Sequence, residues 1–176
     1  MHALNRNLIS WIFTALRLGA AGGLFLGCAS AGAGTCTIQS VNGVAFGAYN
    51  PLSASPTSTN GSINLSCQLS PAFPLPFTAT ISLSAGGSAS YAERKMIPSV
   101  GAIRLNYNIY LDPTYSTVFG DGSAGTQVAQ RCTPLFGLGC GSVSTATNVP
   151  MYGLIPAGQN VSVGSYLDAI VVTVTF

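Results

Sequence analysis

The cysteines are the residues of this sequence best suited to covalent chemistry. One of the five, Cys28, lies in an apolar N-terminal segment, and the rest of the chain holds four: Cys36, Cys67, Cys132 and Cys140. An even set of cysteines in an exported chain favours disulfides. Three pairings are possible, and Cys36–Cys67 with Cys132–Cys140 is the most local of them. Zinc is the competing ligand, but no C-x-x-C spacing occurs and the only histidine, His2, lies in the N-terminal segment.

Catalytic side chains are few. With no histidine beyond position 2, Ser–His–Asp and Cys–His arrangements are excluded from the rest of the chain. Lys95 does not follow a serine at the S-x-x-K spacing. Three aspartates, Asp112, Asp121 and Asp168, fall in separate predicted elements, and an Asp-Gly pair such as Asp121-Gly122 is typical of turns. We therefore predict no enzyme activity, no cofactor and no metal site.

The N-terminal segment has the pattern of a secretory signal peptide. Arg6 precedes an apolar stretch over residues 8–26, and small residues follow at 29–34. This order predicts a signal peptide over residues 1–33, with cleavage after Ala31 or Ala33. Lipoprotein processing at Cys28 is a less favoured alternative, because Phe25 stands where such a signal usually has leucine. The remaining residues, 34–176, have the length of one domain.

Charge is sparse and balanced in this predicted domain. Four basic side chains stand against four acidic ones: Arg94, Lys95, Arg104 and Arg131, with Glu93, Asp112, Asp121 and Asp168. The formal excess of +2 therefore belongs to the predicted signal peptide. No basic stripe could attract nucleic acid, and the low charge with many Ser, Thr, Asn and Gly residues suits an extracytoplasmic surface protein. We expect neither a nucleic-acid partner nor a small-molecule substrate.

Apolar and polar residues alternate with a period of two, as in strands with one buried face. The pattern is clearest in residues 62–69, 77–83 and 105–111. Further strands are expected at 149–155 and in a region over 36–49 that the turn signal Asn42-Gly43 interrupts. A β-branched run closes the sequence and predicts a last strand over residues 164–176. We predict an all-β sandwich, Greek-key or immunoglobulin-like, with about six main strands where seven would be expected.

The long connection between residues 111 and 149 is rich in Gly, Ser and Thr and carries two of the cysteines. A Cys132–Cys140 disulfide would convert residues 133–139 into a small loop with Leu135, Phe136 and Leu138 at its tip. These apolar side chains could contact a surface or receptor, or they could fold back and cap the core. We favour capping, because soluble proteins avoid exposed apolar patches. Residues 73–76 form a second apolar loop with the same two interpretations.

Several segments, in order along residues 36–176, resemble the spore coat protein U domain family, which includes subunits of archaic (Csu-type) chaperone–usher pili. The matching pieces are CTI at 36–38, VAFGAYNP at 44–51, GSINLSC at 61–67, Arg94 with Met96, LNYNIYLD at 105–112 and GSYLD at 164–168 before VTVTF. FGDG at 119–122 stands where the family often has a tryptophan.

The resemblance implies an incomplete immunoglobulin-like Greek-key β-sandwich that lacks its final strand. A periplasmic chaperone would lend a strand, and an outer-membrane usher would replace it with the N-terminal extension of another pilus subunit, which is a form of β-augmentation. The accepting edge would be the last strand, with these residues: Tyr166, Ile170, Val172, Val174 and Phe176. The protein would pass through the periplasm to a pilus or the extracellular space.

The sequence departs from the family pattern ahead of its first predicted strand. Polymerising subunits carry a donor segment there, whereas cleavage after Ala31 or Ala33 leaves only a few Gly, Ala and Thr residues before Cys36. We therefore expect a subunit that accepts a strand and donates none, at a fibre tip and active in adhesion and biofilm formation. The alternative is a non-polymerising secreted coat or matrix protein. A carbohydrate-binding module is a third class, but it would need an aromatic platform, and the aromatic residues look scattered.

Overall fold

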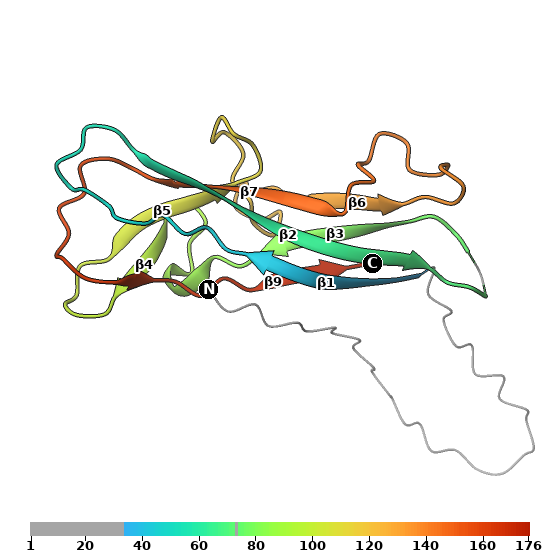
Figure 1. Cartoon of the computed structure of the whole chain (residues 1–176), viewed down its shortest axis with the longest axis horizontal. Coiled ribbons are helices and arrows are strands. Elements are labelled where there is room, and N and C mark those ends of the chain that lie inside the picture. The colour runs from blue at the N-terminus through green and yellow to red at the C-terminus, as the bar shows by residue number, and fades with distance from the viewer. Residues whose placement is uncertain (1–33, 73) are drawn as a thin grey trace, which may run out of the picture.

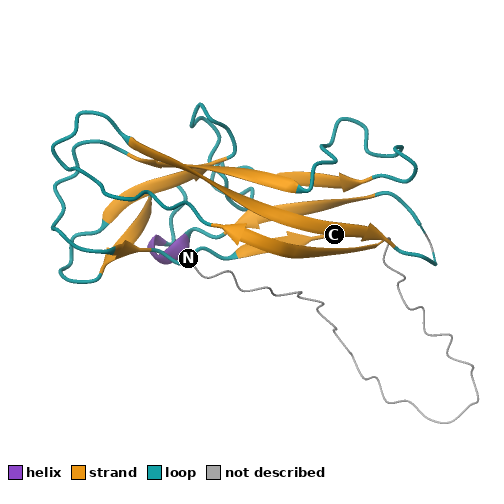
Figure 2. Cartoon of the chain, in the orientation of Figure 1, coloured by secondary structure: helices purple, strands orange, loops and turns teal. Residues whose placement is uncertain are grey.

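The computed structural model describes residues 34–72 and 74–176, so the predicted signal peptide over 1–33 and Phe73 lie outside the described residues. Strands dominate the described chain (Figure 2). They are β1 (Gly34–Asn42), β2 (Thr57–Leu69), β3 (Phe77–Leu83), β4 (Arg94–Pro98), β5 (Leu105–Tyr110), β6 (Ala129–Thr133), β7 (Asn148–Ile155), β8 (Tyr166–Leu167) and β9 (Val172–Thr175), with a single 3-10 turn, η1 (Gly86–Ser88). In this part of the chain, no helix is long and apolar enough to cross a membrane.

The strands form two antiparallel sheets, which confirms the predicted β-sandwich. One sheet has the order β1-β2-β7-β5-β4-β8 and the other the order β6-β3-β9. In Figure 1 the strands run mostly along the long axis of the molecule, and loops connect them at both ends. The predicted alternation holds within them: in β3, Ala79, Ile81 and Leu83 are buried, while the residues between them are not. Side chains of both sheets share one apolar core.

The prediction of one long last strand is wrong. Residues 164–176 form two short strands that belong to different sheets, because β8 pairs with β4 while β9 pairs with β3. The chain crosses from one sheet to the other between Leu167 and Val172. Asp168 lies at this crossing, where its carboxylate accepts hydrogen bonds from other elements. A continuous β-branched pattern therefore conceals a change of sheet.

Three further differences concern weakly patterned segments. Strand β1 ends at Asn42, so the predicted continuation to Tyr49 is not a strand. The sequence pattern missed β4 and β6, and β6 lies inside the supposed long loop. Disulfides join Cys36 to Cys67 across the β1–β2 pair, and Cys132 to Cys140. The structure therefore selects the most local of the three possible pairings.

Candidate functional site: an apolar groove along the last segment

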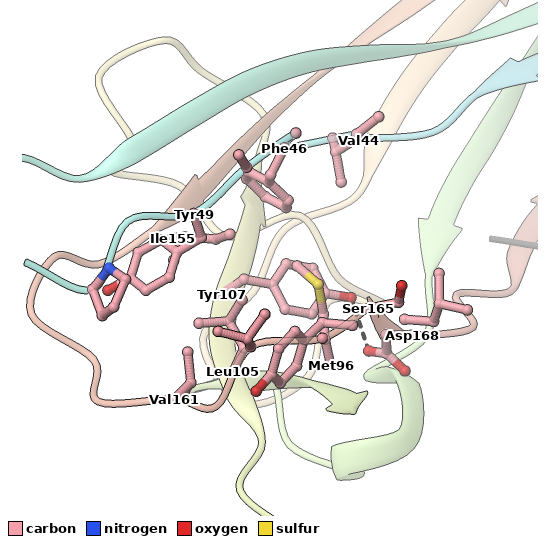
Figure 3. A pocket seen from close by; sticks show the side chains of 18 of the residues that line it. Val44, Phe46, Tyr49, Met96, Leu105, Tyr107, Ile155, Val161, Ser165 and Asp168 are labelled. Atoms are coloured by element: carbon pink, nitrogen blue, oxygen red, sulfur yellow. Dashed lines mark hydrogen bonds between the residues drawn. The ribbon is translucent and has the colours of Figure 1, made fainter. Parts of the chain in front are cut away.

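A groove of about 770 Å³ lies between the segment that follows β1 and the segment that leads into β9 (Figure 3). One border is formed by residues 43–51 and the other by residues 161–168. The floor comes from β4, β5 and β7, through Met96, Leu105, Tyr107 and Ile155. The floor of the groove therefore consists of buried side chains that belong to the core of the sandwich.

Apolar side chains from both borders face this groove. They are Val44, Phe46 and Tyr49 on one side and Val161 and Tyr166 on the other. Phe46 packs edge-on against Tyr107, with ring centroids 5.9 Å apart. Gly153 permits this approach, because a Cβ at that position would lie 2.8 Å from the Phe46 ring. Because Gly153 of β7 has no side chain, the border segment can pack on the floor of the groove.

The borders of the groove have little hydrogen-bonded structure. Residues 43–50 and 156–165 contain no strand. The Tyr49 hydroxyl links the two borders by donating to the Pro156 carbonyl at 3.2 Å and accepting from the Gln159 N–H at 2.8 Å.

Beside the groove, β1 and β9 lie next to each other (Figure 1). Within residues 34–72 and 74–176, however, β1 pairs only with β2, and β9 pairs only with β3. Both strands therefore keep one flank unpaired.

Asp168 anchors the start of the last segment to the floor of the groove. The Tyr107 hydroxyl donates to one carboxylate oxygen at 2.8 Å, and the Gly87 N–H donates to the other at 2.8 Å. Tyr107 is almost fully buried, and this burial, with the Asp168 carboxylate beside it, raises the pKa of its phenol well above the usual range. Tyr107 therefore remains a neutral hydrogen-bond donor, and Asp168 holds the chain where it changes sheets.

Sequence reasoning missed a buried arginine close to this anchor. Arg94 of β4 is fully buried and donates to the carbonyls of Ser84 and Phe119 at 2.9 Å and 2.7 Å. It also donates to the Asn108 side-chain oxygen at 2.6 Å, and its guanidinium lies 5.2 Å from the centroid of the Tyr91 ring. Burial lowers the pKa of the guanidinium. Arg94 therefore stabilises the core by satisfying carbonyl groups of neighbouring segments. A basic residue in a short, weakly alternating segment gave no signal of this role.

The predicted strand-accepting residues fall at different depths. Tyr166 lines the groove, while Ile170 and Val172 are already buried in the core. Val174 is half-buried, and Phe176 is 51% exposed, with its ring 5.9 Å from the centroid of Phe77. The structure therefore divides the predicted edge between a groove wall and a strand flank.

The other two aspartates, Asp112 and Asp121, serve in turns. The Asp112 carboxylate accepts from the N–H groups of Ser116 and Thr117 at 3.2 Å and 2.8 Å, and from Thr114. The hydrogen bond from the Thr114 hydroxyl, together with these backbone bonds, lowers the pKa of Asp112. Asp121 likewise accepts from the Ser123 N–H at 2.9 Å. The described residues hold no group of three or more potential metal ligands among His, Cys, Asp and Glu.

The disulfide-closed loop does not cap the core, so the favoured interpretation is wrong. Phe136 is 94% exposed and Leu138 is 73% exposed, while Leu135 is partly buried. The backbones of Leu135 and Leu138 exchange two hydrogen bonds, which close a tight two-residue turn at Phe136 and Gly137. This turn projects its aromatic side chain into solvent.

The chain is similar in sequence to known proteins. The sequence model of the Spore Coat Protein U domain matches residues 26–173. Protein U of Myxococcus xanthus is 34% identical over 155 residues, which cover 81% of this chain and 78% of that protein. Among solved structures, the chain is similar to one in the CsuC–CsuE chaperone–tip adhesion subunit complex of Acinetobacter baumannii Csu pili. The TM-score is 0.49 at 19% identity, and the match covers 81% of this chain and 40% of that chain.

Proposed function

Because the chain belongs to the spore coat protein U family, we propose that it is an exported structural subunit of a chaperone–usher surface fibre, completed by a β-strand from another polypeptide. The observation that carries this proposal is the apolar groove beside two unpaired strand flanks. A strand laid there would find both hydrogen-bonding groups and apolar contacts. Proteins that receive a strand in this way use main-chain bonds for affinity and alternating side chains for specificity.

The size of the groove is consistent with such a guest. A strand rises about 3.3 Å per residue and points every second side chain to one face. Four or five apolar side chains could enter the groove, while the backbone of the guest strand could pair with the free flank of β1 or β9. At about 1.5–3 kcal/mol for each buried side chain, the gain would explain a complex that scarcely dissociates.

The partners of this function are other chains. We propose that a periplasmic chaperone fills the groove first and that an outer-membrane usher then exchanges it for the strand of a neighbouring pilus subunit. The protein would thus pass through the periplasm to the cell surface. Its role is structural and adhesive, since the groove and the strand flanks beside it offer apolar contacts and main-chain hydrogen bonds to a guest strand.

A tip position follows from the use of the residues near Gly34. Strand β1 begins at Gly34, which pairs with Leu69. Cleavage after Ala31 or Ala33 would therefore leave almost no residues that are not already part of the domain. We propose that the subunit accepts a strand and donates none. N-terminal sequencing of the exported protein should begin at or after residue 32, and ten or more residues ahead of Cys36 would contradict the tip position.

The Phe136 turn is our candidate contact loop for adhesion. Phe136 has φ +49°, a left-handed conformation that asparagine and glycine adopt more easily than an aromatic residue. Strain of this kind is typical of functional positions. No charged residue lies between Arg131 and Asp168, so the turn suits an uncharged apolar surface. Phe136→Asn should relieve the strain and abolish attachment of cells to such a surface. Leu52→Asn, which removes another side chain with 91% exposure, should leave attachment intact.

Strand acceptance can be tested with a synthetic peptide. A ten-residue peptide with alternating apolar residues should bind the mature chain and slow amide hydrogen exchange along the unpaired flanks of β1 and β9. A control peptide of the same composition with its alternation disrupted should not bind. Co-expression with a periplasmic chaperone should yield a one-to-one complex, and the chain alone should unfold at a lower urea concentration than that complex.

The family match also favours a second candidate, a non-polymerising secreted coat or matrix protein with the same domain. Such a protein would fold unaided and would bind neither peptide nor chaperone. The same experiment therefore decides between the two functions, and stable folding with no peptide binding would refute the first.

A further inference from the structure

Three tyrosines gather on the outer face of the six-stranded sheet, away from the apolar core. Tyr110 of β5 lies opposite Tyr152 of β7, and Tyr152 lies opposite Asn60 of β2. The ring of Tyr115 packs edge-on against Tyr110, with centroids 5.6 Å apart and an interplanar angle of 78°. We call Asn60, Tyr110, Tyr115 and Tyr152 the tyrosine patch. The expectation that aromatic residues are scattered is wrong on this face.

The patch lies on the face that the core does not use. In β7, Met151 and Gly153 are buried, whereas Tyr152 between them is partly exposed. In β5, Ile109 is buried and Tyr110 is partly exposed. Cross-strand aromatic pairs stabilise a sheet by about 0.2–1 kcal/mol, and this contribution could account for Tyr110 and Tyr152. It does not account for Tyr115, which comes from a loop.

Tyr115 is held in place by a constrained loop. Its backbone has φ +57°, a left-handed conformation that is an outlier for a bulky residue. The Asp112 carboxylate maintains this loop by accepting from the backbone of Thr114, Ser116 and Thr117. Asparagine would fit the same backbone without strain. The loop therefore holds Tyr115 in a strained backbone conformation that places its ring beside Tyr110.

The chemistry of the patch is neutral and amphipathic. Its side chains offer phenol faces, phenol hydroxyls and one exposed amide, and the exposed hydroxyl of Ser58 lies on the same strand as Asn60. Asp112 is engaged by its own loop, and Arg94 is fully buried. Tyrosine combines an apolar body with a polar tip, and amides both donate and accept hydrogen bonds. These groups match a sugar, whose rings present C–H faces ringed by hydroxyls.

We propose that the tyrosine patch is a binding site for a neutral polysaccharide. Neighbouring strands lie about 4.8 Å apart, so the row from Asn60 through Tyr152 to Tyr110 is about 10 Å long. This length suits a short run of sugar rings. A standard protein partner would bury about 800 Å² on each side, which is more than a row about 10 Å long provides. The patch therefore favours a carbohydrate chain over a protein.

The test is a titration of the mature chain with cellohexaose, a neutral β-linked oligosaccharide, followed by calorimetry and by NMR shifts. We expect saturable binding that Tyr152→Ala and Tyr115→Asn each weaken at least tenfold. Tyr115→Asn is the sharper variant, because it suits the left-handed backbone and should leave the fold intact. Leu52→Asn, which changes an exposed turn outside the patch, is the matched control and should bind as the parent does.

Two sets of results would overturn this inference. One is no saturable binding of cellohexaose at millimolar concentration, or equal binding by the parent and both tyrosine variants. The other is capture of an anionic polymer such as polygalacturonate, or of a protein, through the tyrosines without any binding of cellohexaose. Binding of the strand peptide should be unchanged in the tyrosine variants, so failure of this site is distinguishable from failure of the strand-accepting function.

Discussion

Replacing Arg94 by methionine tests the central polar contact of the core. The substitution keeps much of the side-chain volume but removes every donor. The Asn108 side-chain oxygen would still accept from the Ile109 N–H at 3.0 Å. The carbonyls of Ser84 and Phe119 would lose the arginine, and a buried polar group without a partner costs about 1–3 kcal/mol. The loss is therefore about 2–6 kcal/mol, and it is partly offset because methionine carries no charge to desolvate.

We expect a net decrease of about 2–4 kcal/mol in the free energy of unfolding. This decrease is measured by urea unfolding of the mature chain, followed by far-UV circular dichroism. Tryptophan fluorescence is not suitable, because the single tryptophan, Trp11, lies within the predicted signal peptide. Arg104→Met is the matched control, because Arg104 is exposed and surface substitutions change stability by about 0.5 kcal/mol or less. If both variants unfold within that margin of each other, the reasoning about buried carbonyls is wrong.

Three further predictions concern the groove anchor and the loops. Gly86→Ala should destabilise the mature chain more than Gly47→Ala, since both glycines have positive φ but only at Gly86 would a Cβ meet Asp168, at 2.2 Å; equal urea midpoints would contradict this. Tyr107→Phe should cost about 1.5–3 kcal/mol by removing a hydrogen bond to a carboxylate, and should speed hydrogen exchange at Gly87, whereas unchanged exchange would argue against the anchor. The folded-state pKa of Asp112 lies below its ordinary 3.8. The stability that its carboxylate contributes is therefore present above pH 4 and is lost as the pH falls toward the folded-state pKa. Asp112→Asn should therefore flatten the fall of stability between pH 5 and pH 2, and an unchanged slope in urea unfolding would count against the loop geometry.

Period-two patterns predicted the sandwich well where each strand has one buried face. Strands β2, β3 and β5 appear where the alternation is clearest. The pattern failed at β6, whose AQRCT sequence has no regular alternation. It failed differently at residues 164–176, because alternation describes faces and says nothing about which neighbour a strand pairs with. Pairing partners depend on tertiary contacts such as those of Asp168 with Tyr107 and Gly87.

The candidate site was only partly predictable for a related reason. The apolar residues of the last segment suggested an accepting edge, and Tyr166 does line the groove. The opposite border, with Val44 and Phe46, was predicted as part of a strand region. The Asn42-Gly43 turn signal lies where β1 ends, but it did not reveal that the chain beyond it leaves the sheet. Phe136 was assigned to capping because burial is the usual fate of phenylalanine, and a turn closed by backbone bonds and a nearby disulfide overrides that tendency. Tyr110 and Tyr115 come together only through the Asp112 loop.

The position of β9 has a consequence for biogenesis. Val172 pairs with Leu83, whereas β1 and β2 are neighbours in sequence and share the Cys36–Cys67 crosslink. A polypeptide translocated N-terminus first would therefore finish its oxidised hairpin long before the final residues emerge. Until β9 is made and paired, one flank of β3 stays free to pair with another unfolded chain. Long-range pairing of this kind is slow. Overproduction without a holdase should accordingly deposit this protein as insoluble, β-rich aggregates, even when oxidation of its thiols is complete.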